Sequence, residues 1–400
     1  MRSVDEHLAT ILATVRPIAP IDLGLLEAEG GVLTEDITAA HPLPSFDNSA
    51  MDGYALHADD VADAGPGHPV TLPVVGEVVA GDTGAYAVTT GAAVRITTGA
   101  QLPAGADTVV PVEWTDGGAT KVEVRRAAEP GYAIRRTGED VRAGDQVLAA
   151  GTRVGPVQLG LLAAAGRSAV PVRPRPRVAV LSTGNELAEP GSPVTPGRIW
   201  ESNSFMLAAA ARQAGSIAYR RGAVRDEPRA LMAAIEDQLM RADVLVTSGG
   251  VSMGGEHDVV KDTLSRLGSV EFTKVAMQPG MPQGFGVVGD DRTPIFTLPG
   301  NPVSAYVSFQ LFVRPALRAL QGIDPERLRT VSAMLTGPLR SPEGRRSFAR
   351  ARLERSVVTP LSGQGSHQLA TLAAANALII VPESVTALAM GDEAEVMWLP

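Results

Sequence analysis

Three carboxylates in the second half of the chain each follow a predicted strand. They are Glu186, Asp226 and Asp258, and the last two also precede helical patterns. Carboxylates at such positions can bind Mg²⁺ or act as a base toward water. Asp226 and Asp258 could instead cap the helices that follow them. Glu186 has no such capping duty and is therefore the strongest catalytic candidate of the three.

Turns rich in glycine and hydroxyl side chains follow the apolar segments of this region. Their sequences are Ser182-Thr183-Gly184-Asn185-Glu186, Thr247-Ser248-Gly249-Gly250-Val251-Ser252 and Pro299-Gly300-Asn301-Pro302-Val303-Ser304. Neighbouring glycines let backbone amides approach an anion, and a following helix adds its dipole. One such turn alone is typical of an ordinary strand-to-helix connection. Two such turns at the edge of the same sheet, each followed by a helix, indicate a phosphate-binding site.

The elements around these turns alternate between strand and helix. Helical patterns at 204–214, 228–241, 258–267 and 302–320 follow β-rich apolar segments. This alternation is typical of a parallel α/β sheet, which binds its ligands beyond the carboxyl ends of the strands. We therefore expect the three turns to converge on one phosphate-bearing small molecule.

The rest of the chain predicts three further domains. Ser3 and Glu6 form a capping box for a helix to about Arg16, and a second short helix is expected at 23–29. Turn residues and alternating Val/Thr predict an inserted β-rich domain, and the last part predicts a small β-barrel. The expected domains are 1–43 with 141–172 (N-terminal linking and dimerisation), 44–140 (β-rich insert), 173–322 (α/β) and 323–400 (barrel). The fold class is thus α/β plus β in a multi-domain chain.

Composition excludes several classes of function. The net charge is −9, so no general attraction to nucleic acid is expected. There is no cysteine, which excludes disulfides and thiolate chemistry. No Gly-Lys of a P-loop occurs, and no apolar segment is long enough to span a bilayer. The N-terminal residues lack a signal-peptide pattern, so we expect no membrane association and a cytoplasmic location.

Several other polar residues are ambiguous by themselves. Asp52 lies in a polar loop with Met and Phe, and Thr98 precedes a glycine. Arg350 could bind an oxyanion or be solvated, and Ser366 is equally open. For His257 and His367 we expect surface positions, because neither has a partner histidine nearby.

Taken in order, these stretches resemble the molybdopterin molybdenumtransferase family, the MoeA-like proteins related to the gephyrin E domain. The matching motifs are Phe46-Asp47-Asn48-Ser49-Ala50-Met51-Asp52-Gly53-Tyr54-Ala55, Thr98-Gly99-Ala100, Gly138-Glu139-Asp140, Ser182 to Leu187, Ser248 to Ser252, Leu298 to Ser304 and Gly365-Ser366-His367. The resemblance covers nearly the whole chain, and the number and order of the motifs make it specific.

The resemblance implies Mg²⁺-dependent cleavage of adenylylated molybdopterin and insertion of molybdate into the dithiolene. It implies a homodimer whose active site is shared between the α/β domain of one subunit and the insert of the other. The catalytic residues would be Asp52, Glu186, Asp226 and Asp258, of which the last three would hold the metal. Substrate-binding residues would be Thr98, Arg135, Asp140, Ser182, Thr183, Gly184, Ser248, Gly249, Gly250, Ser252, Pro299, Gly300, Asn301 and Pro302. Molybdate-binding residues would be Ser304, Arg350 and Ser366.

One departure from the family concerns the oxyanion. The family often has Lys-Pro-Gly-Lys-Pro where this chain has Gln278-Pro279-Gly280-Met281-Pro282. A lysine ammonium suits a dianion, and these neutral side chains do not supply one. The missing lysines leave a non-catalytic molybdopterin-binding scaffold open as an alternative function. A molybdopterin adenylyltransferase or nucleotide pyrophosphatase also stays open, because related α/β domains occur in such proteins.

Overall fold

The computed structural model describes residues 1–250, 259–325 and 330–399. They form two compact units. Unit 1 comprises Met1–Ile21, Gly30–Val32 and Val172–Pro400, and unit 2 comprises Asp22–Glu29 and Leu33–Pro171. Within these described ranges, no helix is long and apolar enough to cross a membrane.

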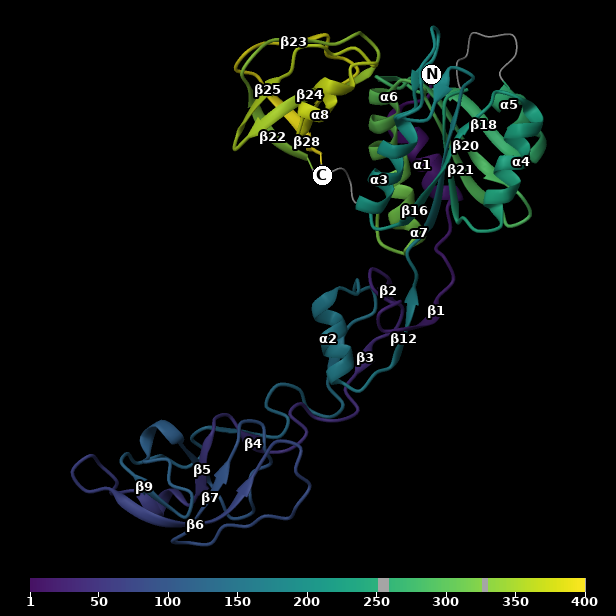
Figure 1. Ribbon diagram of the computed structural model, residues 1–400. Helices are drawn as coiled ribbons and strands as arrows, with labels where there is room; N and C mark the ends of the chain where they lie inside the picture. The colour runs from purple at the N-terminus through teal and green to yellow at the C-terminus, as the bar shows by residue number, and fades with distance from the viewer. Residues whose placement is uncertain (251–258, 326–329, 400) are drawn as a thin grey trace. The chain divides into compact units, whose positions relative to one another are not determined.

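Unit 1 contains a six-stranded sheet (Figure 1). The strand order is β16 (Ile217–Val224), β13 (Arg177–Thr183), β17 (Val244–Ser248), β21 (Thr293–Leu298), β20 (Pro282–Val288) and β18 (Gly268–Lys274). The first four strands are parallel, and β20 and β18 are antiparallel to their neighbours. The expected parallel sheet is therefore confirmed, with an antiparallel edge. The segment 174–176 joins β12 (Ala169–Arg173) to β13 without regular structure, as its alternating Pro and Arg predict.

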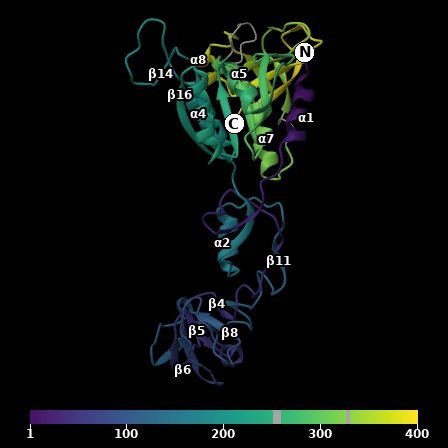
Figure 2. The same ribbon diagram turned by 90° about the vertical axis from the view of Figure 1, so that its right-hand side faces the viewer.

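Helices cover both faces of this sheet, which is why its central strands are apolar on both sides. Val178 and Val180 pack on the face that carries α3 (Asn203–Gln213) and α1 (Val4–Thr14). Ala179 and Leu181 pack on the opposite face, with α4 (Pro228–Leu239) and α5 (Val259–Leu267). The predicted capping box between Ser3 and Glu6 starts α1. Figure 2 shows this layered arrangement from the side.

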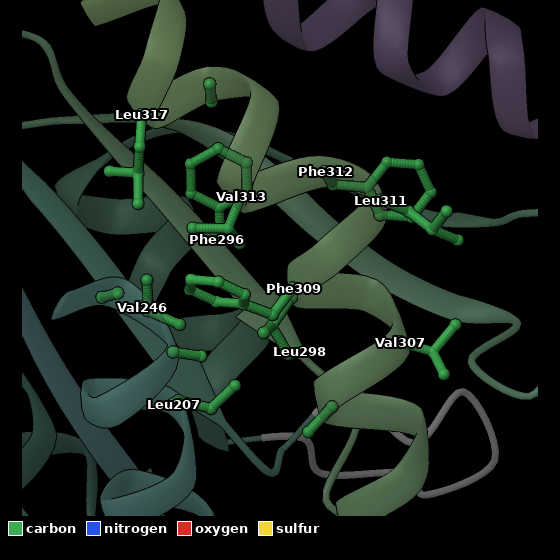
Figure 3. Packing of buried hydrophobic residues seen from close by; sticks show 14 of the residues in the cluster. Leu207, Val246, Phe296, Leu298, Val307, Phe309, Leu311, Phe312, Val313 and Leu317 are labelled. Atoms are coloured by element: carbon green, nitrogen blue, oxygen red, sulfur yellow. The ribbon is translucent and has the colours of Figure 1, made fainter. Parts of the chain in front are cut away.

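The helix predicted at 302–320 is present but irregular. It consists of α6 (Pro302–Ser308), a π-helical segment η3 (Phe309–Val313) and α7 (Arg314–Leu320). Pro315 lacks the N–H that would bond the carbonyl one turn earlier, and its ring would crowd that carbonyl. A wider π turn before the proline relieves this conflict. Phe309 of η3 packs in the same core as Phe296 and Leu298 of β21 (Figure 3).

The C-terminal part of unit 1 is a closed five-stranded barrel. Its strands close in the order β24 (Arg346–Glu354), β25 (Val357–Pro360), β22 (Thr330–Leu335), β28 (Glu393–Trp398) and β26 (Ala377–Val381), and β26 pairs again with β24. The predicted small barrel is confirmed. A short strand of the α/β domain, β19 (Met277–Gln278), also pairs with β24 and fixes the barrel to that domain.

Unit 2 is built around a five-stranded sheet. Its order is β8 (Thr108–Pro111), β5 (Gly53–Leu56), β7 (Ala93–Ile96), β6 (Val70–Val78) and β9 (Lys121–Val124). Its one α-helix in the described residues is α2 (Pro156–Ala164). The helix expected at 23–29 is wrong: β1 (Ile21–Gly24) is followed by turns. Residues 21–24 pair with β12 instead, and the remainder of this segment is too short for a stable helix.

The exact domain boundaries at 44, 141, 173 and 323 stay predictions. The multi-domain α/β plus β fold class is confirmed by the sheet, the barrel and the separate β-rich unit.

Candidate active site

A cavity of about 650 Å³ opens at the carboxyl ends of β13, β17 and β21. Its walls come from the three predicted turns, from the segment before α3, and from the start of α8 (Leu369–Ala374) in the barrel. The lining residues are Ser182, Thr183, Glu186, Leu187, Ile199, Trp200, Glu201, Ser202, Asn203, Asp226, Ser248, Gly249, Gly250, Pro282, Pro299, Gly300, Asn301, Pro302, His367 and Leu369.

Most of the residues predicted in the α/β domain thus lie around one cavity. Gly184 lines a neighbouring cavity of about 630 Å³ instead. Ser304, Arg350 and Ser366 are described but are not among the lining residues. Ser252, Asp258 and His257 lie outside the described residues. Asp52, Thr98, Arg135 and Asp140 belong to unit 2.

The two glycine turns lie against each other. A Cβ built on Gly300 would be 3.6 Å from the Cα of Gly249. Gly249 has φ +97°, and a Cβ there would be 2.5 Å from the carbonyl oxygen of Thr183. Gly250 has φ +69°, and its Cβ would be 2.0 Å from Cγ2 of Val260. At positions 249 and 250, both the positive φ and the close contacts therefore require glycine.

Asn203, the first residue of α3, joins these turns by hydrogen bonds. Its Nδ2 donates to Ser248 Oγ and to the Gly300 carbonyl, both at 2.7 Å, and Ser248 Oγ donates to the Pro299 carbonyl at 3.2 Å. The carbonyl groups at 299 and 300 are therefore both engaged. Among the described residues, the N–H groups of Gly300 and Asn301 have no acceptor. Free amides beside a glycine turn are the donors that an anionic ligand needs.

A buried carboxylate fixes the segment that carries Asn203. Glu201 is 2% exposed and accepts hydrogen bonds from Ser182 Oγ at 2.7 Å, from Ser204 N at 2.7 Å and from Ser204 Oγ at 2.5 Å. The Nη2 atom of Arg220 lies 3.6 Å from Oε2 of Glu201, and Arg220 also forms a salt bridge with Glu189. Because its hydroxyl is bound to Glu201, Ser182 holds the β13 end to the start of α3.

Glu201 and Asn203 were missed in the sequence analysis. Their signal was the polar run Glu201-Ser202-Asn203-Ser204 at the start of a predicted helix. Such a run also fits an ordinary helix cap. In the structure Ser202 occupies the N-cap position and makes no side-chain cap bond, so the run serves other contacts.

The two described carboxylates of the predicted metal site both line the cavity. Glu186 is exposed, and its carboxylate lies close to Gly184. A Cβ built on Gly184 would be 2.6 Å from Glu186 Oε2. Asp226 is half-buried, and its N–H donates to Asn185 Oδ1 at 3.2 Å. Helix α4 has Glu227 at its N-cap, so Asp226 precedes the capping position.

These oxygen donors suit Mg²⁺, which takes one or two carboxylates and otherwise water or phosphate oxygens. The Thr183 hydroxyl adds a buried oxygen that has no hydrogen-bond partner among the described residues. No group of three His, Asp or Glu side chains that could hold a metal occurs within the described ranges, from which Asp258 is missing.

Arg350 is buried rather than solvated. It is 1% exposed, and its NH1 and NH2 donate to the carbonyls of Gly365 at 3.0 Å and Gly363 at 2.7 Å. Burial lowers the pKa of its guanidinium. The Ser366 carbonyl accepts from Val303 N at 3.1 Å, next to Ser304 in α6. The barrel loop that binds Arg350 therefore contacts the start of α6.

In unit 2, Asp52 and Thr98 form a pair on the surface. Asp52 Oδ1 accepts from the Thr98 N–H at 2.6 Å and from its hydroxyl at 2.8 Å. The backbone hydrogen bond is the main reason that the pKa of Asp52 is lowered. Arg135, in β10 (Ile134–Arg135), is opposite Asn48 of β4 (Asn48–Ser49), and its side chain and that of Asp140 are exposed.

Comparison with known proteins shows the family to which the chain belongs. Family models match at residues 2–166 (MoeA N-terminal region, domain I and II), 179–319 (probable molybdopterin binding domain) and 332–399 (MoeA C-terminal region, domain IV). The chain is 48% identical over 405 residues to molybdopterin molybdenumtransferase 2 of Mycobacterium tuberculosis, with 99% of both proteins covered. It is 36% identical to molybdopterin molybdenumtransferase of Bacillus subtilis, over 91% of this chain and 86% of that protein.

A solved structure shows the same architecture. The crystal structure of a molybdopterin biosynthesis MoeA protein from Pyrococcus horikoshii superposes with a TM-score of 0.73 at 31% identity, and all of both chains is covered. By sequence and by fold, this chain belongs to the molybdopterin molybdenumtransferase (MoeA) family.

Proposed function

We propose that this chain is a molybdopterin molybdenumtransferase, which cleaves adenylylated molybdopterin with Mg²⁺ and inserts molybdate into the dithiolene to give molybdenum cofactor. One observation carries the proposal: Ser248–Gly250, Pro299–Asn301, Glu186 and Asp226 all line one cavity. Free amides and carboxylates together suit a phosphoanhydride that is bound with a divalent cation.

Each group has a distinct role in the cleavage. The N–H groups of Gly300 and Asn301 bind phosphate oxygens, and Asn203 keeps these amides in place. Glu186 and Asp226, with Asp258, would hold Mg²⁺, whose charge offsets that of the phosphates. Water adds to phosphorus, and the anhydride P–O bond breaks to release AMP. Glu186 accepts the proton of the water, because its carboxylate is more exposed than that of Asp226.

Molybdate binding is assigned to Ser304, Arg350 and Ser366. Support comes from the contact between the barrel loop and α6, which links these residues through the Val303–Ser366 and Arg350–Gly365 hydrogen bonds. Arg350 Nε has no partner in the described part of the chain, which leaves one N–H donor for an oxyanion.

The functional assembly proposed here is a homodimer in which Asp52, Thr98, Arg135 and Asp140 complete the site of the partner subunit. Mixing two inactive variants, Asp52→Asn and Glu186→Gln, tests this sharing. A shared site should regain about a quarter of wild-type activity, because half of the randomly formed dimers are mixed and each has one intact site. No recovery after proven subunit exchange would place both residues in the site of one subunit.

The main test is an assay with adenylylated molybdopterin, Mg²⁺ and molybdate, in which AMP release and cofactor formation are measured separately. Production of both supports the transferase. Conversion of ATP and free molybdopterin would favour the adenylyltransferase, and AMP release without cofactor would favour the pyrophosphatase. Binding without any AMP release would favour the scaffold.

A further inference from the structure

An indole side chain forms part of the cavity wall and has no role in the function described so far. Trp200 lies on β15 (Ile199–Trp200), which pairs in parallel with β14 (Leu187–Ala188). It lines the cavity and is 58% exposed. The chain contains three tryptophans, and of these Trp200 alone lines this cavity.

The polar edge of this indole is already satisfied. Trp200 Nε1 donates to the Ser192 carbonyl at 3.0 Å. This bond restricts the side chain without using the apolar face of the ring. Ile199 and Leu187 line the same cavity, and Ile199 is also 58% exposed. An apolar ring face that is held in place by its edge is preorganised to stack on a flat ligand.

The polar and apolar parts of the cavity therefore differ in what they can bind. The strand ends offer amides and carboxylates, which suit phosphates and a cation. Among the described lining residues, aromatic rings occur only at Trp200 and His367. A ligand that joins phosphates to a flat heteroaromatic ring would use both parts at once.

We propose that Trp200 stacks on a heteroaromatic ring of the substrate, the adenine or the pterin, while the strand-end amides hold the phosphates. This inference rests on the proposed function, because it assigns a ring contact to that substrate. It makes Trp200 a determinant of substrate affinity rather than of the chemical step.

Tryptophan fluorescence of the full-length protein tests the contact directly. Trp114→Phe and Trp398→Phe leave Trp200 as the only tryptophan; Trp114 stacks on Tyr132, and phenylalanine keeps a ring there. The ligands are AMP, 6-hydroxymethylpterin and, as a ligand without an aromatic ring, ribose 5-phosphate. Saturable quenching is expected with the ligand whose ring stacks, and none with ribose 5-phosphate. Comparison of AMP with the pterin identifies the ring.

Affinity and kinetics give a second readout. Trp200→Ala should raise the Kd of the stacking ligand, measured by isothermal titration calorimetry because this variant lacks the fluorescent residue. It should raise the Kd and the KM of the full substrate about 5- to 150-fold and leave kcat nearly unchanged, as expected for loss of one stacking contact. Trp200→Phe should recover part of the affinity. Trp398→Ala is the matched control, because Trp398 is 44% exposed and does not line the cavity.

Unchanged ring-ligand affinity in Trp200→Ala, or quenching by none of the ligands, would overturn the contact. If wild type still converted the full substrate in that case, the proposed function would stand and only this inference would fall. If wild type converted no substrate but AMP or the pterin quenched Trp200, the stacking contact would stand and the transferase assignment would fall.

Discussion

The carboxylate of Asp52 and the backbone of Thr98 are joined by a hydrogen bond of 2.6 Å, and the Thr98 hydroxyl adds a second of 2.8 Å. Both bonds favour the charged form, with the backbone bond as the larger cause, so the pKa of Asp52 is lowered. Asp52 is therefore ionised at neutral pH, and in the proposed shared site it would serve as a ligand or base rather than as a proton donor.

Thr98→Val should raise the pKa of Asp52 only part of the way to its ordinary value, because the backbone donor remains. Carboxyl-carbon NMR titration, with Asp52→Asn to assign the signal, measures this shift. Since the folded pKa lies below the unfolded one, the contribution to stability is present at neutral pH and is lost as pH falls through the folded pKa. The neighbouring Thr97→Val should leave the titration unchanged; an equal shift there would contradict the pairing.

Glu186→Gln and Asp226→Asn should each reduce kcat at least about 100-fold while the protein stays folded, because each removes a charge that the proposed cleavage needs. Circular dichroism and AMP release measure the two properties. Glu227→Gln is the matched control, since Glu227 is adjacent to Asp226 but does not line the main cavity. Full activity in either variant would remove that residue from the proposed mechanism.

Asn203→Ala should weaken substrate binding more than it weakens the fold. It leaves the Gly300 carbonyl without its donor, which costs about 1–3 kcal/mol, and it frees the turn whose amides bind phosphate. Asn203→Asp should be worse, because a carboxylate cannot donate to that carbonyl. The measurements are KM, kcat and Tm. Ser202→Ala, in the same wall but without a side-chain cap bond, should resemble wild type.

His7 should make the stability of unit 1 depend on pH. It is 2% exposed, and its ring packs edge-on against Phe312 with the two ring centroids 4.8 Å apart. Burial lowers the pKa of His7 from 6.5 to about 4. The folded protein therefore keeps His7 neutral at pH values at which the unfolded chain binds a proton. Stability from this group is complete above about pH 6.5 and is lost as pH falls toward 4.

Between pH 7.5 and pH 5 this effect should lower the free energy of unfolding by about 2 kcal/mol. Urea unfolding of wild type and His7→Gln, monitored on the transition of unit 1, measures it. His7→Gln should show a smaller loss over the same interval. The variant of an exposed histidine, His41→Gln, should behave as wild type does.

The main features of the site could be predicted from sequence because parallel strands bring their carboxyl ends to one edge. Thr183 ends β13, Ser248 ends β17 and Pro299 follows β21. These strands are neighbours in the sheet, and all three residues line the cavity. The closing barrel was also predictable from short alternating strands. These features depend on local patterns of residues, which can be recognised in the sequence.

The remaining features depend on contacts between distant residues. Asn203 bonds Ser248 and Gly300, which are 45 and 97 positions away, and no local pattern specifies such partners. Arg350 of β24 donates to the carbonyls of Gly363 and Gly365, which lie in the loop after the next strand, β25. The segment 23–29 has helix-forming residues, but Leu23 and Gly24 belong to β1, which pairs with the distant strand β12, so tertiary context decided its structure.

Lysine at positions 278 and 281 should tighten the binding of molybdate. Gln278 is exposed on β19 and paired with Ser347 of β24, the strand that carries Arg350, and Met281 precedes the cavity residue Pro282. Two ammonium groups there would add attraction for a dianion, and this attraction should weaken with salt. Gln278→Lys with Met281→Lys should therefore lower the KM for molybdate, most clearly at low ionic strength.

Met240→Lys with Met390→Lys is the control, because it adds the same charge at exposed positions away from the cavity and should have little effect. Equal changes in both double variants would indicate net charge as the cause, and no change in either would place the oxyanion elsewhere.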